Sequence, residues 1–181
     1  MPPEPWSWLG EPLAVDFANT VRRRGRDYTE LLETGADLRA WAQREADRVP
    51  DPPLGTAEAR LADVRALRDA IFALLYATAL GEPVAPGIER QVNAALAAVP
   101  LIPQLRDGEV ELVAPPDADP VDELLARAAA SALELLPSPS LGYCDAPSCG
   151  QFFMRGRSDQ RWCGPACGTR TRVARHARRH R

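Results

Sequence analysis

Lysine is absent from this sequence of 181 residues, and all 22 basic residues are arginine. Histidine occurs only at His176 and His180, and all four cysteines lie after residue 143. Residues 1–143 therefore lack the residue types that most often act as a catalytic base, a reactive nucleophile or a soft metal ligand. We expect that the protein is not an enzyme.

Long hydrophobic runs are also missing. No apolar stretch approaches the roughly 18 residues that a membrane-spanning helix needs, and the first ten residues lack the basic and apolar segments of a secretory signal. The overall composition, 45% apolar and 26% charged, is typical of a folded chain. We expect a soluble cytoplasmic protein with no membrane partner, in which cysteines stay reduced.

Acidic side chains are scarce at one end of the chain. The net charge is −3, but residues 1–150 carry 13 arginines and 24 acidic residues, whereas residues 151–181 carry nine arginines and one aspartate. The two parts therefore have net charges of −11 and +8. Such a split favours an acidic body with a basic, nucleic-acid-binding end. A solvated terminus, or one that folds back on the body, is the alternative.

The first 136 residues have the pattern of a mainly helical domain. Apolar residues at helical spacing predict four helices, over about 36–48, 57–80, 86–98 and 119–136. We expect Thr56 to cap the second of these and Gly81 to end it. Asp107-Gly108 between apolar residues predicts one β-hairpin, and residues 21–27 have the composition of an exposed loop.

The Pro-Ser-Pro-Ser segment at residues 137–140 predicts a linker between two domains, 1–136 and 141–181. Near the N-terminus, Asp16, Asn19 and Thr20 interrupt a short apolar segment that is equally consistent with a strand and a helix. These three residues are candidates for a small-molecule pocket or, less favoured, a catalytic site. Such polar groups more often bond to the local backbone.

The four cysteines form two close pairs, Cys144/Cys149 and Cys163/Cys167, separated by 13 residues. Two turns that each supply two thiolates are the arrangement of a tetrahedral zinc site. Two disulfides are the competing arrangement, but a reducing cytoplasm disfavours them. Four sulfur ligands leave no open position, so we expect structural rather than catalytic zinc. His176 and His180 could replace two ligands, although four cysteines suffice.

A glycine follows three of the cysteines, where it would permit unusual turn conformations. After Cys167, a helix would align Arg172, Arg175 and Arg179 on one stripe, while Val173, Ala174 and Ala177 pack back on the zinc module. The guanidinium group of arginine can donate paired hydrogen bonds to phosphate oxygens and to the edge of a guanine base. The candidate nucleic-acid-binding residues are Arg155, Arg157, Arg161, Arg170, Arg172, Arg175 and Arg179.

Residues 144–170, "CDAPSCGQFFMRGRSDQRWCGPACGTR", resemble the CGNR zinc finger of bacterial proteins regarded as stress-induced transcription regulators. The four cysteines match its zinc ligands, and Arg161-Trp162-Cys163 matches its Arg-Trp-Cys. Cys167-Gly168 and Arg170 match three of the four namesake positions, while Thr169 replaces the asparagine. The segment "LGEPLAVDFANTV" resembles the start of the helical ABATE domain that accompanies this finger.

The resemblance implies a regulator of transcription in the stress response. We therefore expect a mainly α protein: a helical domain with one β-hairpin, then a small four-cysteine zinc module that ends in a helix. Its expected function is zinc-dependent DNA binding, with a homodimer possible. The alternative is a protein-interaction module whose basic finger binds an acidic partner, such as a component of the transcription machinery. An enzyme or small-molecule sensor in the helical domain is less favoured.

Overall fold

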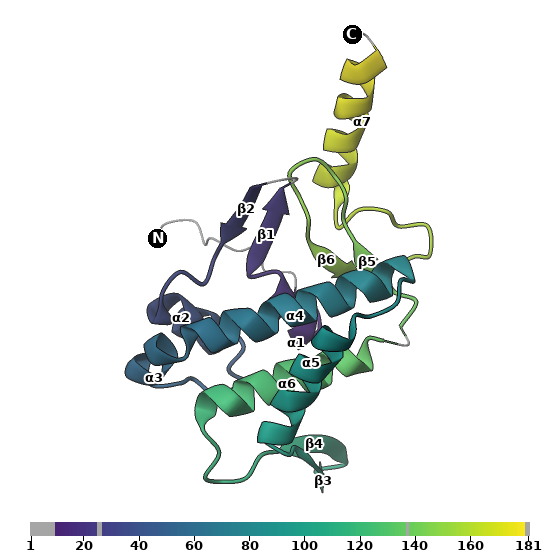
Figure 1. Cartoon of the computed structure of the whole chain (residues 1–181). Coiled ribbons are helices and arrows are strands. Elements are labelled where there is room, and N and C mark those ends of the chain that lie inside the picture. Colours follow the sequence, from purple (N-terminus) through teal and green to yellow (C-terminus); the bar gives the residue numbers. More distant parts are fainter. Residues whose placement is uncertain (1–9, 25–26, 137, 180–181) are drawn as a thin grey trace.

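The structure is a computed structural model that describes residues 10–24, 27–136 and 138–179. These residues form seven helices and three two-stranded antiparallel hairpins (Figure 1). The helices are α1 (Leu13–Ala18), α2 (Gly35–Arg44), α3 (Leu54–Ala59), α4 (Leu61–Leu80), α5 (Pro86–Ala98), α6 (Pro120–Glu134) and α7 (Pro165–Arg179). The mainly helical fold that the sequence predicts, with a cysteine cluster followed by a final helix, is confirmed.

Capping residues place several helix ends where the sequence predicts them. Asp119 begins α6 by accepting hydrogen bonds from the backbone N–H groups of Val121 and Asp122. Gly81 ends α4 in the left-handed conformation, at φ 69°. The short N-terminal segment, for which the sequence left strand and helix open, is helix α1.

The predicted helix over residues 57–80 is wrong in its first part. A break at Arg60 divides this region into α3 and α4, and Thr56 lies inside α3 instead of capping a helix. Arg60 leaves helical geometry at ψ 5°, and its side chain forms ion pairs with Asp63 and Asp122. The break lets α3 contact α2, where the Gly35 N–H donates to a Glu58 carboxylate oxygen. The preceding helix is shorter than predicted, ending at Arg44.

Val21–Arg24 and Asp27, predicted as part of a loop over residues 21–27, lie instead in the strands of a second hairpin of the helical domain. Strands β1 (Val21–Arg24) and β2 (Asp27–Glu30) pair in an antiparallel register. The Glu30 carboxylate at the end of β2 accepts two hydrogen bonds from the buried guanidinium of Arg68 on α4, at 2.6 and 2.7 Å. This ion pair between residues 38 positions apart fixes the hairpin against α4. The sequence of the hairpin has no apolar alternation from which its strands could be predicted.

The hydrophobic core joins the helical domain to the cysteine-bearing segment. Strands β5 (Leu141–Tyr143) and β6 (Phe152–Met154) form a hairpin that packs against α1 and α4. Leu141 and Phe152 lie in the same core as the helices, and the Phe152 ring contacts Phe72 of α4 edge-on, with centroids 4.8 Å apart. The hairpin that carries the first cysteine pair is therefore mounted directly on the helical domain.

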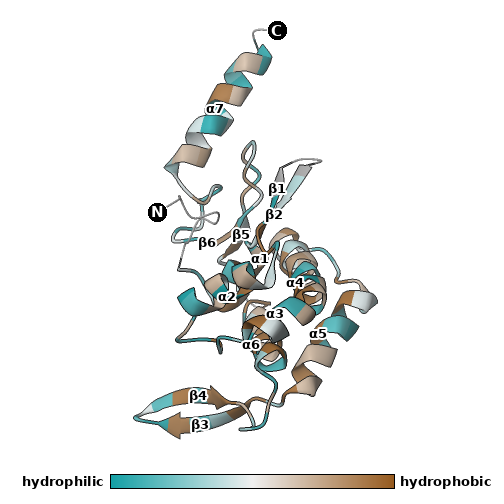
Figure 2. Ribbon diagram, turned by 90° about the vertical axis from the view of Figure 1, so that its left-hand side faces the viewer, coloured by the Kyte–Doolittle hydropathy of each residue, from teal (hydrophilic) through white to brown (hydrophobic). Residues whose placement is uncertain are grey.

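Two elements project from opposite ends of this body (Figures 1 and 2). At one end is α7, and at the other is the predicted hairpin of β3 (Ile102–Arg106) and β4 (Glu109–Val113), turning at Asp107-Gly108. Leu105 and Val110 on this hairpin are 76% and 73% exposed. Their alternation therefore reflects strand pairing and not a buried face.

Candidate metal centre and basic helix

Four cysteines from three separate elements meet at one point. Cys144 follows β5, Cys149 precedes β6, Cys163 lies just before α7, and Cys167 lies in the first turn of α7. All four Sγ atoms lie within 4.8 Å of one another, and every side chain is buried except that of Cys163, which is half-buried. The two predicted pairs thus converge.

The sulfur separations fit a tetrahedral metal site. Cys149 Sγ lies 3.6 Å from Cys163 Sγ, which lies 3.5 Å from Cys167 Sγ. A zinc ion with Zn–S bonds of about 2.3 Å in tetrahedral geometry would hold its sulfurs about 3.8 Å apart. A disulfide needs about 2.05 Å, and all four cysteines are free thiols. The cluster therefore suits a metal ion and not two disulfides.

The first cysteine turn depends on left-handed backbone conformations. Ser148 and Gly150 have φ values of 61° and 72°. The Cys144 N–H donates to the Gln151 carbonyl, and the Gly150 N–H donates back to the Cys144 carbonyl. Of the three glycines that follow cysteines, only Gly150 has a positive φ, so the sequence interpretation is wrong for Gly164 and Gly168.

Gly168 serves a different purpose, which is close packing. A Cβ atom at this position would lie 3.3 Å from the indole ring of Trp162. The missing side chain lets Trp162 lie against the first turn of α7 and beside the cysteines. The tryptophan of the Arg-Trp-Cys motif thereby connects the loop before Cys163 to the helix after it.

The electrostatics of the cluster favour a cation. Hydrogen bonds from the Cys149 and Cys163 thiols lower the pKa of Cys144, whereas the neighbouring Cys144 raises the pKa values of both of these thiols. Without a cation, ionisation of one sulfur therefore opposes ionisation of the next. Arg170 places one positive charge beside the cluster, since its guanidinium donates to Cys167 Sγ at 2.8 Å. Four thiolates together need a metal ion.

The candidate nucleic-acid-binding arginines lie in four different settings. Arg170 contacts the cysteine cluster, and Arg155 donates to the carbonyl of Pro139, which lies within the predicted linker. A shared surface hollow at the start of α7 is lined by Arg157, Arg161 and Arg172. Arg175 and Arg179 lie further along the exposed part of α7. The spacing of Cys167 and Arg170, three residues apart on a helix, is the sequence signal for the contact that sequence reasoning missed.

The buried residues of α7 lie in its first turn. Cys167 and Gly168 are its buried residues, and the rest of the described helix is half-buried or exposed. The expectation that Val173 packs back on the zinc module is wrong, since this side chain is 63% exposed. His176 lies on this outer part, away from the four clustered sulfurs, and His180 lies outside the described residues.

The three polar residues near the N-terminus are buried and bonded within the protein. Asn19 donates to the Phe152 carbonyl at 3.0 Å and accepts from the Phe152 N–H at 2.9 Å. Thr20 donates to the Phe17 carbonyl, and the Asp16 carboxylate accepts from Arg48. Burial raises the pKa of Asp16 to about 6. Their predicted role as a ligand pocket stays a prediction, and the contacts seen here hold α1 to β6 and Arg48.

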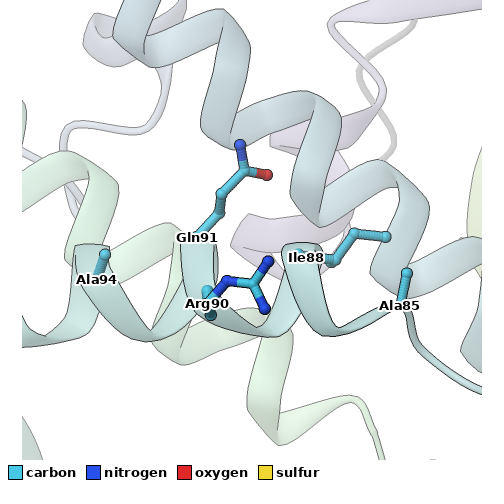
Figure 3. A pocket seen from close by; sticks show the side chains of 6 residues that line it. Ala85, Ile88, Arg90, Gln91 and Ala94 are labelled. Atoms are coloured by element: carbon cyan, nitrogen blue, oxygen red, sulfur yellow. The ribbon is translucent and has the colours of Figure 1, made fainter.

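A second hollow, of about 550 Å³, lies along α5. Ala85, Ile88 and Ala94 line it beside the polar side chains of Gln91 and Arg90 (Figure 3). Its lining offers one charged group and no cysteine, histidine or carboxylate. The chemistry of this face is therefore much poorer than that of the cysteine cluster and its arginines.

Comparison with known families agrees with this geometry. Residues 11–139 match the ABATE family model, described as "Putative stress-induced transcription regulator". The chain belongs to the ABATE family. Residues 141–180 match the CGNR zinc finger, so the resemblance seen in the sequence is confirmed. No curated protein matches the chain.

The two family descriptions together describe a transcription regulator with a zinc finger. In this ABATE protein the cysteines that match the finger are those that cluster, which points to zinc as the metal. Among the described residues, no helix has the length and apolar character needed to cross a lipid bilayer.

Proposed function

We propose that this ABATE protein is a zinc-dependent, DNA-binding regulator of transcription in which α7 contacts the DNA. The proposal rests on how α7 is attached to the rest of the protein. Two of the four cysteines, Cys163 and Cys167, fix its start, while the rest of the helix stands clear of the body (Figure 1). Arg175 and Arg179 lie on the exposed part, and Arg172 lies one turn nearer the cysteines.

In this proposal Cys144, Cys149, Cys163 and Cys167 hold one zinc ion, consistent with reduced thiols in a cytoplasmic protein. The ion would supply a crosslink of the order of 10 kcal/mol between the β5–β6 hairpin, which the shared core holds, and α7, whose buried residues are Cys167 and Gly168. The Arg170 guanidinium partly neutralises the cluster through Cys167. With four sulfur ligands the shell is closed, so the ion's role is structural.

The dimensions and charge of α7 support the DNA contact. An α-helix with its side chains is about 10–12 Å wide, and the major groove of B-DNA is about 12 Å wide. The acidic body carries a net charge of −11 over residues 1–150, so phosphates would repel it. This distribution favours an approach with α7 foremost and the body held away from the duplex.

Fluorescence anisotropy with a mixed-sequence duplex tests the proposal. Replacing Arg175 and Arg179 with glutamine should lower the affinity at least tenfold at low salt. If each contacts a phosphate, the double variant should reduce the slope of log affinity against log salt by about 1.8. The matched control replaces two arginines on the body, Arg90 and Arg106, which should leave both quantities nearly unchanged.

Absence of any DNA affinity in the unmodified protein at low salt would contradict the proposal. Equal losses in the two double variants would show that only net charge matters. Recovery of an acidic protein partner through the same arginines, without DNA affinity, would favour the protein-interaction function instead.

A further inference from the structure

A hollow of about 630 Å³ lies beside the cysteine cluster, between the loop of residues 156–162 and the start of α7. Arg157 and Arg161 line it from the loop, and Thr169 and Arg172 line it from the helix. Trp162 also lines it and lies against Gly168 of α7. The hollow is thus built from both segments that the cysteines bring together.

The charge of the hollow is strongly positive. The lining carries three guanidinium groups and one carboxylate, that of Asp159, whose oxygen lies 3.7 Å from Arg157 Nε. Both of these side chains are more than 80% exposed, so the ion pair is loose and an incoming anion could compete with it. The Thr169 hydroxyl accepts from Arg172 and keeps its own proton for another acceptor. The lining therefore offers mainly hydrogen-bond donors.

The loop is held in place before any ligand arrives. Gln160 is the central contact: its side-chain oxygen accepts from the Gly156 N–H at 2.9 Å, and its side-chain nitrogen donates to the Trp162 carbonyl at 3.1 Å. Its own N–H donates to the Arg157 carbonyl. A single side chain thus closes the loop on itself, which limits the ordering entropy that binding would require.

We propose that this hollow binds one phosphate group of the DNA backbone and thereby sets the orientation of α7 on the duplex. The inference rests on the proposed function, and it adds a specific contact to it. Guanidinium groups on two sides of a phosphate can donate to separate oxygens, whereas a single exposed arginine cannot fix an angle. Contacts of this kind position a protein on DNA without reading its sequence.

The first test is the salt dependence of duplex binding by the full chain. Replacing Arg157 and Arg161 with glutamine should lower the affinity about tenfold at low salt and reduce the slope by about 0.9, the value for one phosphate. The Asp159→Asn variant should bind about two- to fivefold more tightly, because it removes the only negative charge in the lining. The control is the double variant of Arg90 and Arg106.

Amide NMR spectra locate the contact independently. Duplex DNA should shift the N–H signals of Gly156, Gly164 and Gly168 in the unmodified protein, and should shift them much less when Arg157 and Arg161 are replaced. Inorganic phosphate, added alone, distinguishes the source of the anion. If inorganic phosphate causes weak shifts of these signals and DNA then displaces the phosphate, the hollow is a site for a backbone phosphate. If the shifts caused by inorganic phosphate remain unchanged when DNA is bound, the proposal is overturned.

The two proposals fail differently. If the unmodified protein binds DNA but the Arg157/Arg161 variant keeps the affinity and slope of the control, the hollow is not a phosphate site and the DNA-binding function stands. If the unmodified protein does not bind DNA, both proposals fail together.

Discussion

Asn19 provides the most direct test of how the cysteine module is attached to the helical domain. Its amide forms two hydrogen bonds with the backbone of Phe152, 133 residues away, and the two residues are 4% and 0% exposed. The Asn19→Ala substitution leaves a buried N–H and a buried carbonyl without partners. Each costs about 1–3 kcal/mol, so the free energy of unfolding should fall by about 2–6 kcal/mol.

Urea denaturation of the zinc-loaded protein, followed by far-UV circular dichroism and by zinc release to a chromophoric chelator, measures this loss. Both signals should move to lower urea together, because Phe152 belongs to the helical core as well as to β6. Thr20→Val is the matched control. It removes a buried hydroxyl, but the Phe17 carbonyl keeps its bond from the Thr20 N–H, so the loss should stay below about 1 kcal/mol. Equal losses in the two variants, or zinc release that moves without the helical signal, would refute this reasoning.

Three further predictions concern the metal, the pH dependence and the packing. Cys163→Ser should weaken zinc binding by more than about tenfold in a chelator competition; unchanged affinity would remove this sulfur from the ligand set. Burial raises the pKa of Glu45 to about 7 from an ordinary value of 4.5, so the folded state holds a proton that the unfolded state releases. The stability of the unmodified protein should therefore fall relative to Glu45→Gln as the pH rises from about 4.5 to 7, by about 1–3 kcal/mol. Urea midpoints at pH 5 and pH 8 measure this difference, and parallel midpoints would contradict it. A Cβ atom on Gly35 would lie 2.6 Å from the Glu58 backbone nitrogen, so Gly35→Ala should destabilise by about 1–3 kcal/mol in thermal unfolding. Gly55→Ala should not destabilise the protein, because the space around this position is open. Equal destabilisation by the two substitutions would exclude the clash at Gly35.

The parts of the fold that the sequence predicts well depend on local signals. Residues 86–98 form α5 with the predicted bounds, because a proline at the first position and a regular apolar spacing define it. The Asp107-Gly108 turn likewise determines its own hairpin. The spacing of the cysteines predicts that the two close pairs come together, and the expectation of reduced thiols favours a metal site over two disulfides.

Most structural features that could not be predicted from the sequence depend on contacts between residues distant in the chain. Asn19 resembles many polar residues near a helix end, and only the fold brings it to Phe152. The β1–β2 hairpin depends on Arg68, and the break at Arg60 depends on Asp122, 62 residues away. Arg170 is the exception, because its partner Cys167 is only three residues away and helical spacing could have predicted the contact.

The central claim is that a metal-anchored α7 contacts DNA, and duplex binding with and without a strong zinc chelator tests it most directly. Anisotropy measured over a range of salt should show binding that weakens steeply with salt and disappears on chelation, because the cysteines hold the start of α7. Binding that survives complete removal of the metal with the same salt slope would contradict the account. It would reduce the interaction to the attraction of an arginine-rich terminus.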